Sequence, residues 1–494
     1  MAPRKTESQA TDLVKKVWQM ADVLAGQGIG YTDYLTQLTY LLFLKMDYEV
    51  SAFGEPSRIP EQYRWPTLIE QTLAGKEQKL TPEEQLEQYE EILAALSRDG
   101  YPDEFVRSIF AKAQNKIDKA PYLSKVIDMI NQVQWFSFDS DVKGAIYEGI
   151  LEKNGQETKS KAGQYFTPRA LIKAMVDVTD PKIDEKVWDP ACGTGGFLLA
   201  AYDHMKAQSK NGAKLKRLKE QGLRGQDNTP LVVTMGSMNM FLHGIEGKKS
   251  PIMLGDSLLS RPDELADVVL ANPPFGARPS GSVEFKREDF VVETNNNQLN
   301  FLQHIMSLIK TGGRAAVVLP DNVLFVKEGA AIRRSLLQDF NLHTILRLPS
   351  GIFYAKKVQT NVLFFTKGEP TTDLWIYDFR SGMNFSMSKN PMQRKDLDDF
   401  VSCYHADGHG GLGERHETYN EESNPDGRWR KFSAKEFLAQ EDCNLNVATW
   451  IGTKKSEIEE MDLEQLMAAM QQKLTTINEA FASVQQAIKE SRHV

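Results

Sequence analysis

The stretch Val187–Phe197, VWDPACGTGGF, decides the fold class of this chain. It reads as the end of a buried strand, a glycine-rich turn, and the start of an apolar helix that continues through Leu198 and Leu199. Glycine at such a turn lets the backbone approach a ligand closely at the carboxyl end of a sheet, where open α/β folds bind their ligands. The expected ligand-binding residues of this turn are Asp189, Pro190, Ala191, Gly193, Thr194, Gly195 and Gly196.

The turn departs from the common nucleotide-binding loops. Leu198 stands where a G-x-G-x-x-G loop has its third glycine, and the turn is not followed by the Gly-Lys-Ser/Thr of a P-loop. Taken alone, the stretch therefore leaves a tight turn without a ligand as an alternative.

Short apolar strands separated by helical patterns continue from this turn to Phe365. Such alternation predicts a largely parallel sheet with helices on both faces, and the apolar run Ala315–Leu319 is typical of a strand covered on both faces. After Lys367 the pattern weakens, and Asp407–Arg428 reads as exposed loop because it is rich in Gly, Glu, Asn and Asp. The expected strands are Val187–Trp188, Leu223–Arg224, Ile252–Leu254, Asp267–Leu270, Arg314–Leu319, Thr344–Leu348 and Asn361–Phe365.

The chain before the sheet reads as helical. Apolar residues recur at three- and four-residue spacing over residues 13–24 and 34–44, with Gly26–Gly30 as the break between two helices. A third helix is expected over residues 82–96, with Thr81 as its N-cap. Residues 1–145 are therefore predicted to form a helical domain without strands.

A heptad pattern marks the end of the chain. So narrow an apolar stripe on a polar helix favours docking on a partner helix, and docking on the chain's own domain is the alternative. The division expected is a helical domain over residues 1–145, an α/β domain over 146–445 and a helical docking tail over 446–494. The stripe consists of Met467, Met470, Leu474, Ile477, Phe481, Val484 and Ile488.

Composition limits the partners and the compartment. The 494 residues carry 59 Lys and Arg against 67 Asp and Glu, a net charge of −8, which repels a polyanion unless basic residues gather on one face. The three cysteines, Cys192, Cys403 and Cys443, form no C-x-x-C pair, which argues against a disulfide framework and fits a reducing cytoplasm. Residues 1–9 lack the apolar core of a signal peptide, and no stretch reaches the roughly 18 apolar residues of a membrane span.

Acidic residues end two of the expected strands. Asp227, in Gly225-Gln226-Asp227, is placed where a carboxylate accepts both ribose hydroxyls of a nucleoside. Asp256 lies in Gly255-Asp256-Ser257-Leu258, the segment directly after Ile252–Leu254, where a carboxylate can accept the exocyclic amine of an adenine. For each aspartate, a helix N-cap is the alternative.

The most informative motif ends the strand Asp267–Leu270 and reads Ala271-Asn272-Pro273-Pro274-Phe275. Two consecutive prolines remove two backbone donors, so the local main chain presents carbonyl groups only. The side chain of Asn272 adds an amide oxygen, and Phe275 offers a flat face for a planar base. These groups suit a ligand whose amine is attached to a flat ring, because two acceptors on its hydrogens localise the nitrogen lone pair for attack on a methyl sulfonium.

In this order, the glycine-rich turn, the acidic strand ends and Asn-Pro-Pro-Phe resemble the amino-group DNA methyltransferases. The resemblance implies a Rossmann-like domain that binds S-adenosylmethionine and methylates N6 of a flipped-out adenine. It also implies that Asn272 and the Pro273 carbonyl orient the adenine amine and that Phe275 stacks on the base. The upstream segment similar to the family's contacts with the methionine part of the cofactor is Gln164, Tyr165, Phe166, Thr167 and Pro168.

Most of the chain further resembles the modification subunit of type I restriction-modification systems. That resemblance implies double-stranded DNA, a specificity subunit shared by two modification subunits, and a restriction subunit as partners. One departure is Asp227, where the family more often has Glu, although the shorter side chain should still reach a ribose. The segments that carry the resemblance are Leu42–Lys45, Ala145–Leu151, Phe301–His304, Val318–Phe325 and Leu348–Phe353.

The short length of chain after the expected sheet indicates where DNA sequence is recognised. Only about 75 residues, Gly-rich and acidic, separate Phe365 from the last ordered segment, so sequence recognition is expected on a separate subunit. The polar stretch Gly276–Asn297 is expected to close over DNA. The basic run from Lys206 to Lys219 reads as a solvated helix face, with phosphate contact as the alternative.

The chemistry needs no covalent cysteine and no metal. Cys192 reads as a small residue of the cofactor turn, and His405, His409 and His416 lack the spacing of metal ligands.

Three competing functions remain. A glutamine methyltransferase uses a similar motif but more often ends it with Tyr, and a non-catalytic scaffold would not need the intact residues of Asn272–Phe275. A fused restriction enzyme is disfavoured because the helical start shows no nuclease pattern.

Overall fold

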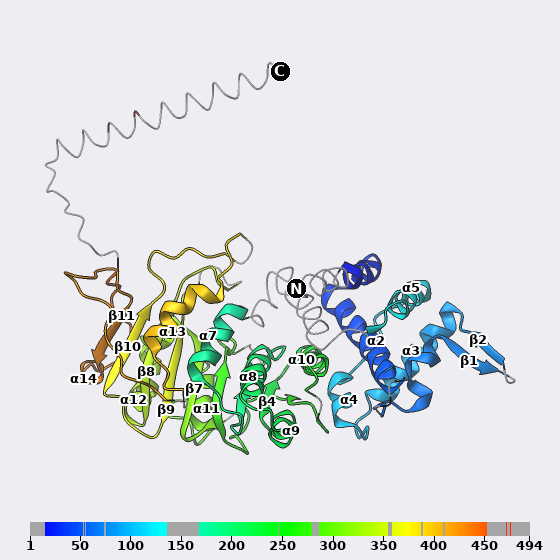
Figure 1. Cartoon of the computed structure of the whole chain (residues 1–494), viewed down its shortest axis with the longest axis horizontal. Helices are drawn as coiled ribbons and strands as arrows, with labels where there is room; N and C mark the ends of the chain where they lie inside the picture. The colour runs from blue at the N-terminus through cyan, green and yellow to red at the C-terminus, as the bar shows by residue number, and fades with distance from the viewer. Residues whose placement is uncertain are drawn as a thin grey trace.

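The structure is a computed structural model that describes residues 15–52, 54, 56–73, 76–135, 167–245, 247–278, 286–353, 358–386, 389–408, 411–451, 471 and 475. A helical N-terminal part lies beside a larger domain built on a sheet, and helix α10 (Pro230–Leu242) lies where the two parts meet (Figure 1).

The larger domain contains a nine-stranded sheet in the order β11-β10-β8-β9-β7-β6-β3-β4-β5. Neighbouring strands from β7 to β5 pair in parallel, as do β8 and β10, whereas β9 runs antiparallel between β7 and β8 and β11 is antiparallel to β10. The largely parallel sheet predicted from the sequence is thus confirmed. The strands are β3 (Val187–Asp189), β4 (Leu223–Asp227), β5 (Ile252–Leu254), β6 (Ala266–Ala271), β7 (Ile309–Pro320), β8 (Phe340–Leu348), β9 (Thr360–Lys367), β10 (Asp373–Asp378) and β11 (Trp429–Ser433).

Helices cover both faces of this sheet. Successive side chains of a strand point to opposite faces, and in β6 Val268 and Leu270 join one buried cluster while Val269 and Ala271 join another. The first cluster includes residues of α7, α8 and α13, and the second includes residues of α11, α12 and α14. The helices of the domain are α7 (Arg169–Thr179), α8 (Gly196–Ala207), α9 (Gly212–Gln221), α10, α11 (Asn297–Leu308), α12 (Ala330–Gln338), α13 (Asp398–Tyr404) and α14 (Ala434–Leu438), with 3-10 turns at Asp321–Leu324, Lys327–Gly329 and Arg394–Leu397.

The last two strands lie where the sequence pattern weakened. β10 pairs with β11 across the intervening residues 379–428, and the rings of Trp375 and Trp429 stack at 5.4 Å between centroids. β11, with the sequence WRKFS, is too short and too polar to indicate a strand alone. Its pairing is determined by the edge of the sheet rather than by local sequence.

The N-terminal part is helical with one exception. The break at Gly26–Gly30 is present, and Thr81 caps α3 in a capping box with Glu84. The prediction that no strand precedes Trp188 is wrong, because β1 (Glu70–Leu73) and β2 (Lys76–Lys79) pair as an antiparallel hairpin. Both strands are polar, and β2 is exposed throughout, so no apolar alternation announces them. The other elements here are a helix from residue 15 to 25, α2 (Tyr31–Ala52), α3 (Pro82–Leu96), α4 (Glu104–Ile109), α5 (Ala120–Asn131) and 3-10 turns at Glu61–Tyr63 and Trp65–Leu68.

Helix α10 belongs to two cores at once. Met235, Met238 and Phe241 pack into the N-terminal cluster, whereas Val233 and Met240 pack into a cluster of the sheet domain. The Thr234 hydroxyl also donates a buried hydrogen bond of 2.8 Å to the carbonyl of Ile109 in α4. The two domains are therefore joined by a shared buried helix.

The domain boundaries stay predictions. The expected boundary at residue 145 lies outside the described residues. At the other end, Trp450 is buried and its indole nitrogen donates to the carbonyl of Gly427 at 3.0 Å, so packing continues a few residues past 445. Apart from Gln471 and Thr475, the heptad helix also lies outside the described residues. No helix within the described part of the chain is long and apolar enough to cross a membrane.

Candidate active site

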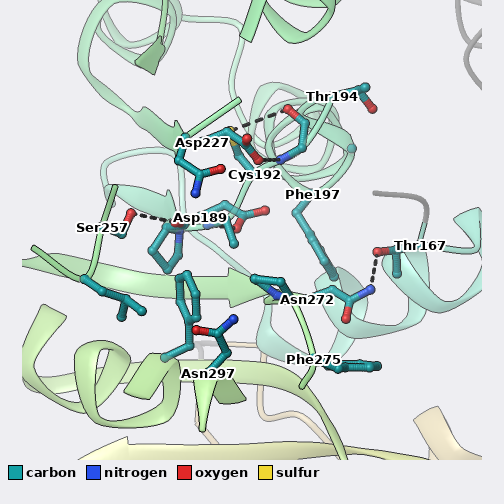
Figure 2. A pocket seen from close by; sticks show the side chains of 18 of the residues that line it. Thr167, Asp189, Cys192, Thr194, Phe197, Asp227, Ser257, Asn272, Phe275 and Asn297 are labelled. Carbon is teal, nitrogen blue, oxygen red and sulfur yellow. Dashed lines mark hydrogen bonds between the residues drawn. The ribbon is translucent and has the colours of Figure 1, made fainter. Parts of the chain in front are cut away.

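A cavity of about 390 Å³ opens at the carboxyl ends of β3, β4, β5 and β6 (Figure 2). This is the edge of the sheet where parallel α/β folds bind their ligands. It brings together most of the residues that the sequence singled out. Those that line it are Thr167, Asp189, Pro190, Ala191, Gly193, Thr194, Gly196, Asp227, Asp256, Ser257, Asn272, Pro274 and Phe275.

The other expected site residues fall into two groups. Pro168, Gly195 and Pro273 do not line the cavity themselves but adjoin residues that do. Gln164, Tyr165 and Phe166 lie outside the described residues.

The glycine-rich turn has the backbone shape that requires glycine. Gly193 and Gly195 have φ values of 54° and 83°, in the left-handed region that disfavours side chains. A Cβ at Gly195 would also lie 2.6 Å from Cε of Met240. Gly195 is the N-cap of α8, so the unpaired N–H groups of the first turn of the helix lie beside the cavity.

Helix α10 packs directly against the glycine-rich turn. The side-chain amide of Asn239 donates to the carbonyl of Thr194 at 3.0 Å. A Cβ at Gly236 would approach the Gly193 carbonyl oxygen to 3.1 Å, so the helix backbone lies almost against the turn. The same helix that packs on the N-terminal domain therefore shapes the cavity.

Two buried carboxylates lie at the base of the cavity. Asp189 is 1% exposed, and burial, reinforced by the charge of Asp227, raises its pKa to about 8 although the Ala191 N–H donates to it. Burial also raises the pKa of Asp227, whose Oδ2 accepts from the N–H of Gly193 at 3.3 Å. Carboxyl groups held in so little water suit a cationic ligand that bears hydroxyl or amine donors.

Asp227 is not a helix N-cap, because the N-cap of the following helix α10 is Thr229, but it contacts that N-cap. Its Oδ1 accepts from the N–H of Thr229 at 2.9 Å, and Thr229 is the N-cap of α10. Asp227 therefore orients the start of the helix as well as lining the cavity.

Asp256 is not a helix N-cap, because no helix begins between residues 255 and 265. It stabilises a turn instead. Its Oδ1 accepts from the Leu258 N–H at 2.9 Å, and its Oδ2 lies 3.8 Å from the Arg278 guanidinium. The neighbouring Ser257 hydroxyl donates to the Pro190 carbonyl at 2.6 Å. This bond ties the turn after β5 to the glycine-rich turn after β3.

Asn272 has a fixed amide with one end unused. Its Nδ2 donates to Oγ1 of Thr167 at 2.9 Å. Its Oδ1 is buried, and no group among the described residues donates to it. Figure 2 shows the nitrogen directed toward Thr167 and the oxygen on the other side of the amide. Leaving a buried acceptor unpaired costs roughly 1–3 kcal/mol, so such an atom in a cavity indicates a place for a ligand donor.

The chain after this motif returns to the cavity wall. The N–H of Gly276 donates to Oε1 of Gln298 at 2.8 Å, and the N–H of Asn297 donates to the carbonyl of Gly276 at 2.9 Å. These bonds place Asn297, at the start of α11, on the cavity wall. Arg278 lies on the same wall.

Several lining residues were not expected from the sequence. Most belong to the same turns as the expected ones, so a wider window around each motif would have included them. Asn297 and Phe301 come from α11, some twenty residues after the Asn-Pro-Pro-Phe motif, and only the fold brings them back. The lining residues that the sequence analysis did not assign to the site are Arg169, Ile172, Cys192, Phe197, Asn228, Gly255, Leu258, Ala277, Arg278, Asn297 and Phe301.

Cys192 lines the cavity, but its thiol is not activated. Cys192 is buried, and burial raises the pKa of its thiol well above the ordinary value, which keeps it protonated. Within the described ranges, no three His, Cys, Asp or Glu side chains gather as metal ligands do.

In the basic run from Lys206 to Lys219, Lys214 pairs with Asp184 at 2.6 Å on the exposed side of α9.

Comparisons with known proteins identify the family of this chain. The family described as N-6 DNA methylase matches residues 138–459, and the HsdM N-terminal domain matches residues 13–130. The chain is 37% identical to the StySPI methylase subunit of a type I restriction enzyme from Salmonella potsdam, over 90% of this chain and 89% of that one. Identity to the EcoKI methylase subunit of Escherichia coli K12 is also 37%, with the same coverage.

Solved structures show the same likeness. The crystal structure of the EcoKI M protein matches with a TM-score of 0.54 and 32% identity, over 96% of both chains. A chain from the structures that describe assembly and conformational transition of the type I R-M system matches with a TM-score of 0.72 and 28% identity, over 96% of this chain and 98% of that one. Since these matches extend over both domains, the chain belongs to the N-6 DNA methylase family and, within it, to the methylase subunits of type I restriction-modification enzymes.

Proposed function

We propose that this chain transfers a methyl group from S-adenosylmethionine to N6 of an adenine that has turned out of double-stranded DNA. It acts as the catalytic modification subunit of a type I complex in which a separate specificity subunit reads the sequence. The observation that carries the proposal is the buried, unpaired Oδ1 of Asn272 beside the cavity, on an amide whose nitrogen is held by Thr167.

The arrangement answers the main chemical difficulty, which is the weak nucleophilicity of an aromatic amine. Its lone pair is delocalised into the ring, and it becomes available when both N–H groups donate to acceptors. Asn272 Oδ1 supplies one acceptor, and the carbonyl of Pro273 is the second, because the following residue is another proline. Proton release follows formation of the new N–C bond, and positioning supplies much of the acceleration.

The cofactor supplies an electrophilic methyl group on a sulfonium. The carboxyl groups of Asp189 and Asp227 fit the cationic part of this ligand, and the unpaired N–H groups in the first turn of α8 would suit its carboxylate. The carboxylate of Asp227 would bind the ribose hydroxyls, and Asp256 would accept from the adenine amine of the cofactor. The cofactor-binding set that we propose is Gln164, Tyr165, Phe166, Thr167, Pro168, Asp189, Pro190, Ala191, Gly193, Thr194, Gly195, Gly196, Asp227, Asp256 and Ser257.

The target base would occupy the side of the cavity beside Phe275. The Phe275 ring is partly buried against the core of the sheet domain, which holds it in place as a stacking surface. With Pro274 closing the turn, the catalytic set that we propose is Asn272, Pro273, Pro274 and Phe275. Extrusion of the base is required because its N6 atom is not accessible to this cavity within a duplex.

The net charge of −8 indicates that the chain alone binds DNA weakly. We therefore propose two modification subunits around one specificity subunit, joined by a restriction subunit in the full complex and acting in the cytoplasm. The descriptions of the related proteins as methylase subunits of type I restriction enzymes support the place of this chain in such a complex. The heptad helix of the tail, residues 446–494, would dock on the specificity subunit.

Methyl transfer by the purified chain tests the proposal, alone and with its co-expressed specificity subunit. The DNA product, digested to nucleosides, should contain N6-methyladenine only when both subunits are present. Methylation of cytosine, or of a protein glutamine in place of DNA, would contradict the proposal.

A further inference from the structure

A buried arginine outside the cavity connects the loops that surround it. Arg287 lies in the polar stretch after the Asn-Pro-Pro-Phe motif, and its side chain is 3% exposed. Its Nε and Nη2 atoms donate to the two carboxylate oxygens of Asp289, each at 2.7 Å. The guanidinium also lies over the ring of Phe290, 4.4 Å from its centroid. Arginine is suited to such a place because its planar group makes paired bonds in a fixed geometry.

The remaining nitrogen of Arg287 faces two other elements. Its Nη1 lies 3.3 Å from the carbonyl oxygen of Leu258 and 3.3 Å from Nδ1 of His304 in α11. Burial, aided by the charge of Arg287, lowers the pKa of His304 to about 3, so the ring is neutral at physiological pH. Since a guanidinium only donates, Nδ1 of His304 is the acceptor and its proton is on Nε2.

The contact with Leu258 connects Arg287 to the cavity lining. Leu258 lines it and directly follows Asp256 and Ser257 in the turn after β5. The Ser257 hydroxyl in turn donates to the Pro190 carbonyl of the glycine-rich turn at 2.6 Å. A continuous buried chain of bonds therefore runs from Arg287 to both cofactor turns.

The carboxylate of Asp289 neutralises the buried charge of Arg287. Hydrogen bonds from Arg287 hold the pKa of Asp289 far below its ordinary value, so the carboxylate stays ionised across the physiological range. The positive charge of the guanidinium is thus balanced by Asp289, while Nη1 donates to the Leu258 carbonyl. A buried cation without such a partner would be strongly destabilising.

We propose that Arg287 is a positioning residue for the cofactor, because it fixes the turn Asp256–Leu258 through the Leu258 carbonyl. The proposal rests on the function proposed above, since it assumes that S-adenosylmethionine occupies the cavity. The same side chain belongs to the stretch that follows the catalytic motif, so it locks this stretch and the cofactor turn to each other.

Arg314 provides a matched control. It is also a buried arginine paired through two bonds with a carboxylate, Glu185, at 2.8 Å each, and it donates to the carbonyls of Thr179 and Asp180. It lies in β7 opposite Val268 and does not line the cavity. Substituting either arginine removes a similar set of bonds, but only one of them contacts a cofactor turn.

The test measures the dissociation constant of S-adenosylmethionine by calorimetry with the full chain, for Arg287→Ala, Arg287→Lys and Arg314→Lys. We expect Arg287→Ala to weaken binding at least about tenfold, since a charge-assisted hydrogen bond is lost, and Arg287→Lys to lie between it and the unmodified chain. Arg314→Lys should bind the cofactor within about twofold of the unmodified chain, although it lowers the melting temperature.

Steady-state kinetics of the complex with the specificity subunit adds a second readout. For Arg287→Lys, the KM for S-adenosylmethionine should rise more than the KM for DNA and more than kcat falls. The inference is overturned if both Arg287 variants bind the cofactor as the unmodified chain does, or if Arg314→Lys weakens binding as much as Arg287→Lys. These outcomes differ from failure of the proposed function, in which the unmodified chain would bind no S-adenosylmethionine or would methylate no adenine.

Discussion

Thr167 and Asn272 come from segments 105 positions apart, and they meet in one hydrogen bond of 2.9 Å. The bond uses the amide nitrogen of Asn272 and leaves its buried oxygen unpaired at the cavity. In this arrangement the Thr167 hydroxyl accepts from the amide nitrogen, so the amide oxygen is the end left for a ligand donor. The segment before the glycine-rich turn therefore contributes to the catalytic motif as well as to the cofactor site.

Removing this acceptor should disorder the amide. Thr167→Val keeps the shape of the side chain but cannot accept from Asn272, so kcat should fall at least about tenfold. Thr167→Ser keeps the hydroxyl and should stay within about threefold of the unmodified chain. Single-turnover methyl transfer in the complex measures both, and a Val variant as fast as the Ser variant would refute the role.

Phe275 tests the placement of the target base. Phe275→Ala removes the stacking surface, and stacking on an aromatic side chain contributes about 1–3 kcal/mol per base, so methylation should slow about ten- to a hundredfold. Phe275→Tyr keeps the ring and serves as the control. The fluorescence of 2-aminopurine at the target position reports extrusion, and an equal signal with Ala and Tyr would contradict stacking on this residue.

The raised pKa of Asp189 makes cofactor binding depend on pH. At a pKa of about 8 the carboxyl group is protonated at neutral pH, and a cationic cofactor favours its ionised form. Binding should then release a proton, and affinity should rise by up to about tenfold per pH unit until about pH 8. Calorimetry in buffers of different ionisation enthalpy measures this release, and Asp189→Asn should abolish the contribution.

In the cofactor-free protein, the raised pKa of Asp189 makes the stability of the fold decrease as pH rises. Its folded-state pKa lies above the unfolded value of about 3.9, so its contribution to stability is complete below about pH 4 and is lost as pH rises to about 8. Urea unfolding at pH 6 and pH 8 should show a smaller pH effect for Asp189→Asn than for the unmodified chain. An equal pH effect in both would contradict the assignment.

The shared helix α10 predicts that the two domains unfold together. The Phe241 ring lies 4.8 Å from that of Phe43 and 6.2 Å from that of Phe105, measured between centroids. Phe241→Ala should cost about 3–5 kcal/mol, whereas Leu265→Ala, at a side chain 42% exposed, should stay within about 0.5 kcal/mol. Denaturant unfolding followed by tryptophan fluorescence and circular dichroism checks this, and two separate transitions would contradict the coupling.

Two of the strands that the sequence predicted, β6 and β7, contain a continuous buried apolar run. β6 and β7 are covered on both faces, so their local sequence alone indicates a strand. β11 and the hairpin of β1 and β2 differ because they lie at edges, with polar side chains and few buried positions. Their formation depends on a partner strand, which local periodicity does not report.

The same distinction applies to the candidate site. Asp227 ends β4, Asn272 follows β6 and Asp256 lies two residues after β5, so parallel topology alone brings them to one edge of the sheet. Arg287 lies in an irregular stretch and Asn297 begins the helix that follows it, and their positions depend on bonds such as that from Gly276 to Gln298. No spacing rule connects those residues to the site, and only the folded structure places Asn297 on the cavity wall and Arg287 against the carbonyl of Leu258.

The most direct test of the account compares Asn272→Ala and Asn272→Asp with the unmodified chain in the complex with its specificity subunit and cognate DNA. The rate of a single methyl transfer is measured beside the dissociation constant of S-adenosylmethionine. We expect the Ala variant to transfer at least about a hundredfold more slowly while binding the cofactor within about twofold. Transfer by the Ala variant within a few-fold of the unmodified rate would contradict the role of the Asn272 amide oxygen.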